Sequence, residues 1–180
     1  MISYEKRTIF LTGAIIIAIG GIISFFFLPM TVQNMMLHTT NTFFIQTPSA
    51  VIKLYLAALA CLTVAFLLVF FFWKKGIIPS ILLTVGAIVM FVFAFNHFQL
   101  MSEEGITWSD LSSLEKQSYA WSEIKEIQSV PKTEGKGYNI VITFKDGNDV
   151  TFTRDAVFNS KYYKFQEKLT EYNLSFVGKD

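Results

Sequence analysis

The chain has 180 residues, of which 52% are hydrophobic and only 16% are charged. Because soluble domains carry roughly 25% charged residues, this composition favours a membrane protein. Residues 1–97 hold five basic residues and one acidic residue, a net charge of +4, whereas residues 98–180 hold ten basic and thirteen acidic residues, a net charge of −3. The single cysteine, Cys61, excludes an intrachain disulfide.

Three uncharged apolar runs fill most of the first half, at residues 9–28, 54–73 and 77–95. A helix of about 20 residues is long enough to cross a hydrocarbon core of about 30 Å. For the first run a cleaved signal peptide is the rival interpretation, but "FFFLPM" offers no small-residue cleavage site. We therefore expect residues 1–97 to form a domain of three transmembrane helices. Pro79 falls in the first turn of the third, where a proline is tolerated.

Basic residues flank these runs unevenly. Lys6 and Arg7 precede the first run, and Lys74 and Lys75 separate the second from the third. Short loops rich in lysine and arginine stay in the cytoplasm. The pattern predicts a multi-pass protein of the cell membrane, with a cytoplasmic N-terminus and an extracytoplasmic C-terminal domain.

Between the first two runs, "PMTVQNMMLHTTNTFFIQTPSAVIK" carries no charge before Lys53, and we expect it to lie along the membrane interface. Small residues at four-residue spacing, Ala57, Cys61 and Ala65, allow close helix contact, either within one chain or in a homo-oligomer. Neither histidine, His38 or His97, has the neighbours that a metal site needs.

From residue 98 onward the periodicity changes to that of strands. Two short strands are expected at 98–101 and 105–108, joined by an acidic turn. "YAWSEIKEIQSV" reads as a strand broken near Ser122, with a helical turn over 122–127 as the rival.

The clearest unit is "YNIVITFKDGNDVTFT", in which apolar residues alternate before and after an Asp-Gly turn. Residues 159–172 then place Tyr162, Phe165, Leu169 and Tyr172 on one helical face, with Asn159 or Ser160 as the N-cap. "LSFV" returns as a short strand or an extended tail. Residues 98–180 therefore form an α+β domain of antiparallel strands closed by one helix.

The order of "FQLMSEEGI", "YAWSEIKEI", "YNIVITFKDG" and a terminal helix resembles the bacterial pleckstrin-homology-like (PH-like) domains that are attached to transmembrane helices. The resemblance covers residues 98–175. It implies paired sheets or a small barrel capped by a helix, and a scaffold for binding partners. It carries over no catalytic residue.

Candidate binding residues are few. The early strand loop that is basic in phosphoinositide-binding relatives is acidic here, so Lys132 and Lys136 are the candidates for an anion site. Trp108 is either a core residue or an anchor for a partner.

The sequence favours a non-enzymatic scaffold or sensor that lies in the lipid bilayer and presents a PH-like domain to a protein partner. The alternative is a subunit of a transporter or channel with the soluble domain as a gate. No catalytic constellation, nucleotide loop, zinc spacing or basic run is present, so we expect no enzyme activity, cofactor, metal or nucleic acid.

Overall fold

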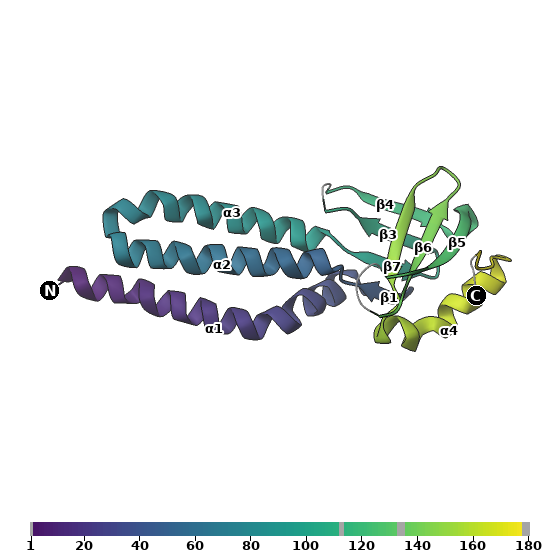
Figure 1. Ribbon diagram of the computed structural model, residues 1–180, viewed down its shortest axis with the longest axis horizontal. Helices are drawn as coiled ribbons and strands as arrows, with labels where there is room; N and C mark the ends of the chain where they lie inside the picture. The colour runs from purple at the N-terminus through teal and green to yellow at the C-terminus, as the bar shows by residue number, and fades with distance from the viewer. Residues whose placement is uncertain (1, 112–113, 133–135, 178–180) are drawn as a thin grey trace. The chain divides into compact units, whose positions relative to one another are not determined.

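A computed structural model describes residues 2–111, 114–132 and 136–177 (Figure 1). The chain divides into two compact units. The helical unit comprises Met1–Met35 and Thr47–His97, and the α+β unit comprises Met36–Gln46 and Phe98–Asp180. The segment 36–46, which the sequence analysis assigned to the membrane domain, thus belongs with the C-terminal half.

The helical unit contains α2 (Ser49–Phe72), the short 3-10 helix η1 (Trp73–Gly76), α3 (Ile77–Asn96) and all of α1 (Ile2–Leu37) but its last two residues, which belong to the α+β unit. Helices α2 and α3 form an antiparallel hairpin, and α1 runs alongside it (Figure 1). The sequence predicted three membrane-spanning runs, whereas among the described residues two stretches are long and apolar enough to cross a membrane. These are Lys6–Ser24 in α1, and Ser49–Asn96, which contains α2, η1 and α3. Helix α1 is longer than its predicted apolar run and continues through Pro29.

Small residues hold the hairpin together. Ala58 and Ala65 of α2 are buried, as are Ser80, Ala87 and Ala94 of α3, so that each helix buries a small residue at every seventh position. Spacing by seven keeps one face of a helix toward its partner, and small side chains let the two backbones approach closely. Of the stripe noted in the sequence, Ala65 is buried within the chain, whereas Ala57 is exposed and Cys61 is half-buried.

The turn of the hairpin is equally tight. A Cβ atom on Gly76 would lie 2.2 Å from the carbonyl oxygen of Leu68, so only glycine fits there. The hydroxyl of Ser80 lies 2.6 Å from the carbonyl oxygen of Ala65 and 2.7 Å from that of Gly76. Pro79 occupies the first turn of α3, as predicted.

Gln33 joins the three helices at the other end of this unit. Its side-chain nitrogen donates to the carbonyl of His97 at 2.8 Å, and its side-chain oxygen accepts from the Thr47 hydroxyl at 2.7 Å. The side chain is only 2% exposed, and both ends of its amide are hydrogen-bonded. Burial without such partners would be costly.

The α+β unit has two antiparallel sheets. Sheet A contains β1 (Thr42–Gln46), β2 (Gln99–Ser102), β3 (Gly105–Ser109) and β4 (Lys116–Ala120), in that order. Sheet B contains β5 (Ile124–Pro131), β6 (Tyr138–Phe144) and β7 (Asp149–Thr153), followed by α4 (Ala156–Glu171). The expected α+β arrangement of antiparallel strands and one C-terminal helix is confirmed.

One apolar core lies between the two sheets and α4. The alternation that the sequence predicted is confirmed in β6, where Ile140, Ile142 and Phe144 point inward. Helix α4 adds Phe158, Phe165 and Leu169. The buried members of this core are Phe44, Met101, Ile106, Trp108, Trp121, Ile124, Ile127, Ile140, Ile142, Phe144, Val150, Phe152, Phe158, Phe165 and Leu169.

Strand β1 corrects the expectation of an interfacial loop between the first two apolar runs. Phe44 pairs with Met101 of β2, is 3% exposed, and packs against Phe152 and Phe158. The segment "TFFIQ" is rich in β-branched and aromatic residues, which suits a strand that buries one face.

The last residue of β1 also joins the two sheets. The side-chain amide of Gln46 donates to the carbonyl of Thr153 at 2.8 Å and accepts from its backbone N–H at 2.7 Å. Gln46 thereby bonds to β7 as a peptide group of a neighbouring strand would.

Three local predictions are refined. Helix α4 begins at Ala156, with the Asp155 carboxylate accepting from the Phe158 N–H at 2.8 Å, so Asn159 and Ser160 are not its N-cap. The break near Ser122 is a single 3-10 turn, η2 (Trp121–Glu123), between β4 and β5. The terminal "LSFV" is extended, and Phe176 forms a parallel bridge with Ile127.

Candidate functional site

A groove of about 410 Å³ lies on the outer face of sheet A, within the α+β unit. Because side chains alternate along a strand, the inward residues Met101 and Ile106 fill the core while their neighbours Leu100 and Thr107 face the groove. Its lining is completed by Met36, Leu37, Thr39, Asn41, Thr42, Phe98, Ser102, Glu104 and Lys116.

The groove combines an apolar floor with hydrogen-bonding walls and one charge of each sign. Asn41 donates to the carboxylate of Glu104 at 3.1 Å. The ammonium of Lys116 lies 5.4 Å from the ring centre of Phe98, a cation–π contact. Such a lining suits a ligand with both apolar and polar groups, and its balanced charge gives no preference for a strong anion.

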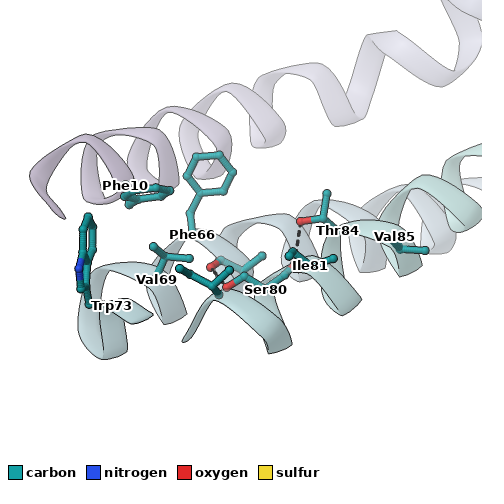
Figure 2. Close-up of a pocket in the computed structure, with 10 residues that line it drawn as sticks. Phe10, Phe66, Val69, Trp73, Ser80, Ile81, Thr84 and Val85 are labelled. Atoms are coloured by element: carbon teal, nitrogen blue, oxygen red, sulfur yellow. Dashed lines mark hydrogen bonds between the residues drawn. The ribbon is translucent and has the colours of Figure 1, made fainter. Parts of the chain in front are cut away.

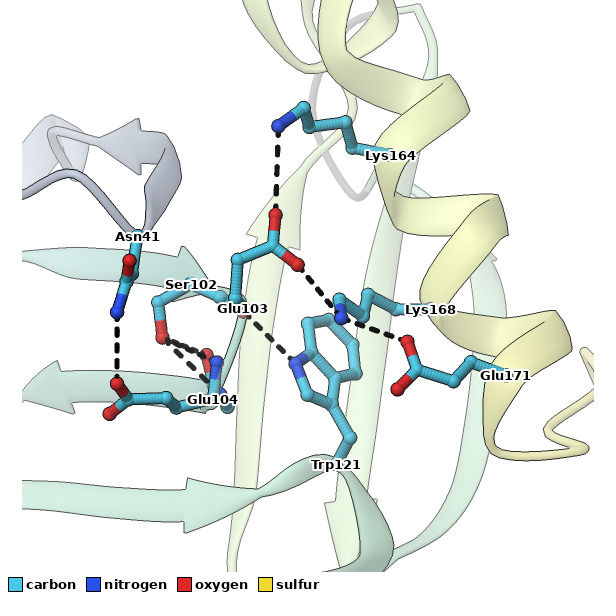
Figure 3. A network of polar contacts seen from close by, with 9 residues as sticks. Asn41, Ser102, Glu103, Glu104, Trp121, Lys164, Lys168 and Glu171 are labelled. Atoms are coloured by element: carbon cyan, nitrogen blue, oxygen red, sulfur yellow. Dashed lines mark hydrogen bonds and ion pairs between the residues drawn. The ribbon is translucent and has the colours of Figure 1, made fainter.

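A polar network behind the groove fixes the β2–β3 turn (Figure 3). Glu103 accepts from Lys168 at 2.8 Å and pairs with Lys164 at 3.6 Å, and Lys168 also contacts Glu171 at 2.8 Å. The hydrogen bond from Lys168 holds the pKa of Glu103 below its ordinary value, and the hydrogen bonds to Glu103 and then Glu171 raise the pKa of Lys168. The network anchors α4 to the turn beside the groove.

Trp121 supports the same turn from the core. Its ring nitrogen donates to the carbonyl of Ser102 at 3.0 Å (Figure 3). Its ring also stacks on Phe43 at a centroid distance of 6.3 Å. Since Trp121 is fully buried, this hydrogen bond satisfies a donor that would otherwise be costly to bury.

A second polar cluster joins β4 to the β6–β7 turn. The Tyr119 hydroxyl donates to the Asp146 carboxylate and accepts from the side-chain N–H of Asn148. The bond to Asp146 raises the pKa of Tyr119, and the same bond lowers the pKa of Asp146. These exposed groups stabilise the turn that positive-φ Gly147 allows, and they give no nucleophile with an adjacent base.

The three binding residues suggested by the sequence do not form one site. Trp108 is 3% exposed and stacks on Tyr119 and Phe144, so it belongs to the core. Lys132 and Lys136 lie at the far end of the β5–β6 ladder from Phe144, in the connection whose residues 133–135 lie outside the described ranges. The Lys132 N–H donates to the Gly137 carbonyl at 3.0 Å.

The sequence did not predict the groove, because five of its eleven lining residues come from the segment that was expected to lie along the membrane interface. The sequence of this segment does indicate a strand. A β-prone run lies between Asn41 and Pro48, and a run bounded by such turn residues is typical of a strand. Within residues 2–111, 114–132 and 136–177 no three His, Cys, Asp or Glu side chains gather as a metal site.

Comparison with family models, curated proteins and solved structures finds no match to this chain.

Proposed function

We propose that this protein is a multi-pass membrane protein that holds its α+β unit at the membrane surface as a non-enzymatic interaction module. One observation carries the proposal. Strand β1 lies between α1 and α2 in the chain, β2 follows α3, and the two strands pair from Gln46↔Gln99 to Thr42↔Ser102. The chain therefore leaves the α+β unit through α2 and returns to it through α3.

The exposure of the helices supports membrane insertion. Only 22% of the apolar window in Ser49–Asn96 and 11% of that in Lys6–Ser24 is buried. A core helix of a water-soluble protein would be mostly buried, because exposed apolar area costs about 25 cal/mol per Å². Side chains such as Ile78 (72% exposed) and Phe27 (70% exposed) need an apolar surrounding.

Three crossings follow if α1, α2 and α3 each span the bilayer. Lys74 and Lys75, in the turn of the hairpin, and Lys6 and Arg7 would then face the side opposite to the α+β unit. By the distribution of basic residues that side is the cytoplasm. The α+β unit would lie outside the cell membrane.

The resemblance to PH-like domains receives support from the architecture. A four-stranded and a three-stranded antiparallel sheet, followed by a C-terminal helix, agree with the paired sheets that the resemblance implies. The proposed partner is a protein segment with apolar and polar side chains in the groove of sheet A, since residues 98–180 carry a net charge of −3 and disfavour anionic headgroups.

A paired cysteine experiment tests the topology. In a Cys61→Ala background, Lys161→Cys on exposed α4 and Lys75→Cys in the hairpin turn are labelled with a membrane-impermeant maleimide. We expect labelling of Lys161→Cys in intact cells, and of Lys75→Cys only after lysis. The reverse pattern would invert the orientation, and labelling of both in intact cells would exclude a spanning hairpin.

Photo-crosslinking tests the groove. A photoreactive amino acid at Thr107, on the groove floor, should give one major adduct in intact cells, whereas the same group at exposed Tyr163 on α4 should not. The adduct should weaken when Leu100→Glu places a charge on the floor. Equal adducts from both positions, or an adduct that ignores Leu100→Glu, would exclude the groove as the binding surface.

A further inference from the structure

The helical unit contains a cavity of about 450 Å³ between α1, α2 and α3 (Figure 2). Phe10 comes from α1, Phe66 and Val69 from α2, and Ile81 and Val85 from α3. The volume lies within the 300–1,000 Å³ typical of ligand pockets. Each of the three helices thus contributes apolar side chains to the wall.

The two hydroxyl groups in the wall do not change this character. Ser80 is hydrogen-bonded to backbone carbonyls of the hairpin, and Thr84 donates to the carbonyl of Ser80 at 2.8 Å (Figure 2). Their polar atoms are already satisfied by the helices. An occupant of the cavity is therefore a hydrocarbon group, which asks for no hydrogen bond.

One end of the cavity is basic. Trp73 closes that end, with its ring edge-on to Phe10 at 6.2 Å, and the guanidinium of Arg7 lies 5.5 Å from the Trp73 ring centre. Lys74 and Lys75 follow Trp73 in the chain and are exposed. A hydrocarbon cavity thus ends beside a group of positive charges.

Arg7 has unused hydrogen-bonding capacity there. Its Nε atom is buried and, among the residues that the structure describes, makes no hydrogen bond. A buried donor without an acceptor costs about 1–3 kcal/mol, and a guanidinium group matches the two oxygens of a phosphate. An anion at Arg7 would supply the missing acceptor.

The backbone at Trp73 is also unusual. Its φ is +46°, one of two positive values at non-glycine residues among those described. Non-glycine residues adopt this region at a cost of about 1–3 kcal/mol and are concentrated at ligand sites. This strained residue carries the indole that contacts both Arg7 and Phe10, at the junction of the basic end and the cavity.

We infer that the helical unit binds an anionic phospholipid, whose phosphate accepts hydrogen bonds from Arg7 and whose acyl chain enters the cavity beside Trp73. The inference rests on the proposed membrane insertion, which brings lipid to this face. Charge complementarity favours an anionic headgroup over a zwitterionic one, and the continuous apolar cavity favours a lipid over a free anion.

Quenching of tryptophan fluorescence by brominated acyl chains tests the inference. The full chain is reconstituted in phosphatidylcholine vesicles that contain brominated phosphatidylglycerol or, at the same mole fraction, brominated phosphatidylcholine. We expect phosphatidylglycerol to quench at about tenfold lower mole fraction, the preference that one charge-assisted contact gives. The Trp73→Phe variant should lose this preferential quenching.

Two variants distinguish binding of the lipid headgroup from binding of its acyl chain. Arg7→Gln should remove the preference for phosphatidylglycerol, whereas Lys53→Gln, which deletes the same charge near the start of α2, should keep it. Val85→Phe should fill the cavity and weaken quenching by both lipids. Equal quenching by both lipids in the wild type, or loss of the preference in Lys53→Gln as in Arg7→Gln, would overturn the inference.

Free anions and a failed insertion give different results. Inorganic phosphate should not abolish the quenching. If phosphate abolishes it to the same extent in Lys53→Gln and in the wild type, the site binds a free anion and the assignment of a lipid is wrong. Extraction of the protein from vesicles by alkaline carbonate would contradict the proposed function itself. A protein that resists extraction but shows no preference would contradict only the lipid site.

Discussion

The two units of this protein bury opposite kinds of side chain. In the helical unit the buried apolar residues are mostly alanines, such as Ala58 and Ala87, while isoleucines and phenylalanines such as Ile78 and Phe71 are exposed. In the α+β unit the large side chains, among them Trp121, are inside. The α+β unit therefore gains stability by removing large apolar side chains from water, whereas the helical unit leaves such side chains exposed and buries small ones where its helices pack closely.

The largest effect should come from separating the two units. Since Gln46 pairs with Gln99, the α2–α3 hairpin occupies the position of a β-hairpin turn between β1 and β2. A chain of residues 36–47, Asn-Gly and residues 98–177 should fold in water, because Asn-Gly forms the tight turn that joins antiparallel strands. Residues 98–177 alone lack β1 and should aggregate through the open edge of β2. Circular dichroism and size-exclusion chromatography of both chains measure the difference.

A single substitution sharpens the same point. Phe44→Ala in the full chain should lower the free energy of unfolding of the α+β unit by about 3–5 kcal/mol, the cost of truncating a buried phenylalanine. A Trp73→Phe background leaves Trp108 and Trp121, both in the core of this unit, as fluorescent reporters of denaturation by urea. Tyr163→Ala, at an exposed aromatic residue, should change stability by under about 0.5 kcal/mol.

The position of Phe44 in the core could not be predicted from the sequence, whereas other parts of the fold could. The β6–β7 hairpin follows from local alternation and an Asp-Gly turn, and Gly147 indeed takes a positive φ of 95°. The apolar runs follow from length and composition alone. Strand β1 depends instead on partner residues that lie 53 or more positions further along the chain, and no local sequence pattern identifies them.

The groove could not be predicted from the sequence for the same reason. Its walls come from residues on both sides of the hairpin, such as Asn41 and Glu104, and only the pairing of β1 with β2 brings them together. The sequence leaves Trp108 as a candidate anchor because a short strand contains too few residues to show which of its faces is buried. Charge alone identifies Lys132 and Lys136 as candidates, and charge does not predict which other side chains lie near them.

The helical unit should respond to a change that the α+β unit ignores. Gly76→Ala places a methyl group 2.2 Å from the Leu68 carbonyl oxygen, so the hairpin turn must open at a cost of about 1–3 kcal/mol. Gly20→Ala is the control, because its Cβ would meet no atom within 4 Å. Thermal aggregation of the detergent-solubilised chain should start at lower temperature in Gly76→Ala only. If the Trp108 and Trp121 signal of the α+β unit shifts equally, the units do not unfold independently.

Gln46 tests how the two sheets are joined. Gln46→Ala leaves the N–H and carbonyl of Thr153 without their partners and should cost about 1–3 kcal/mol of the stability of the α+β unit. Gln46→Glu keeps an acceptor for the Thr153 N–H, but loses the donor and places a carboxylate near Asp155. It should therefore be at least as destabilising at neutral pH and recover in acid, when that carboxylate is protonated. Denaturation by urea at both pH values distinguishes the two variants.

The smallest effect should come from the ion pairs of Glu103. Because its pKa is lowered in the folded chain, its contribution is present above its ordinary pKa of 4.5 and is lost as the pH falls through the lower folded value. The contribution of Lys168, whose pKa is raised, is present below 10.5 and is lost as the pH rises through the folded value. Glu103 is 45% exposed, so solvent screening limits the loss in Glu103→Gln to about 1 kcal/mol or less between these limits. The Glu103→Gln variant should lose less stability than the wild type as the pH falls. The neighbouring Glu104→Gln, which leaves Lys164 and Lys168 paired with Glu103, should lose as much as the wild type. Protonation of Asp146 should leave some loss of stability in both variants. Equal acid profiles of urea denaturation in the two variants would show that the network of Glu103 does not anchor α4.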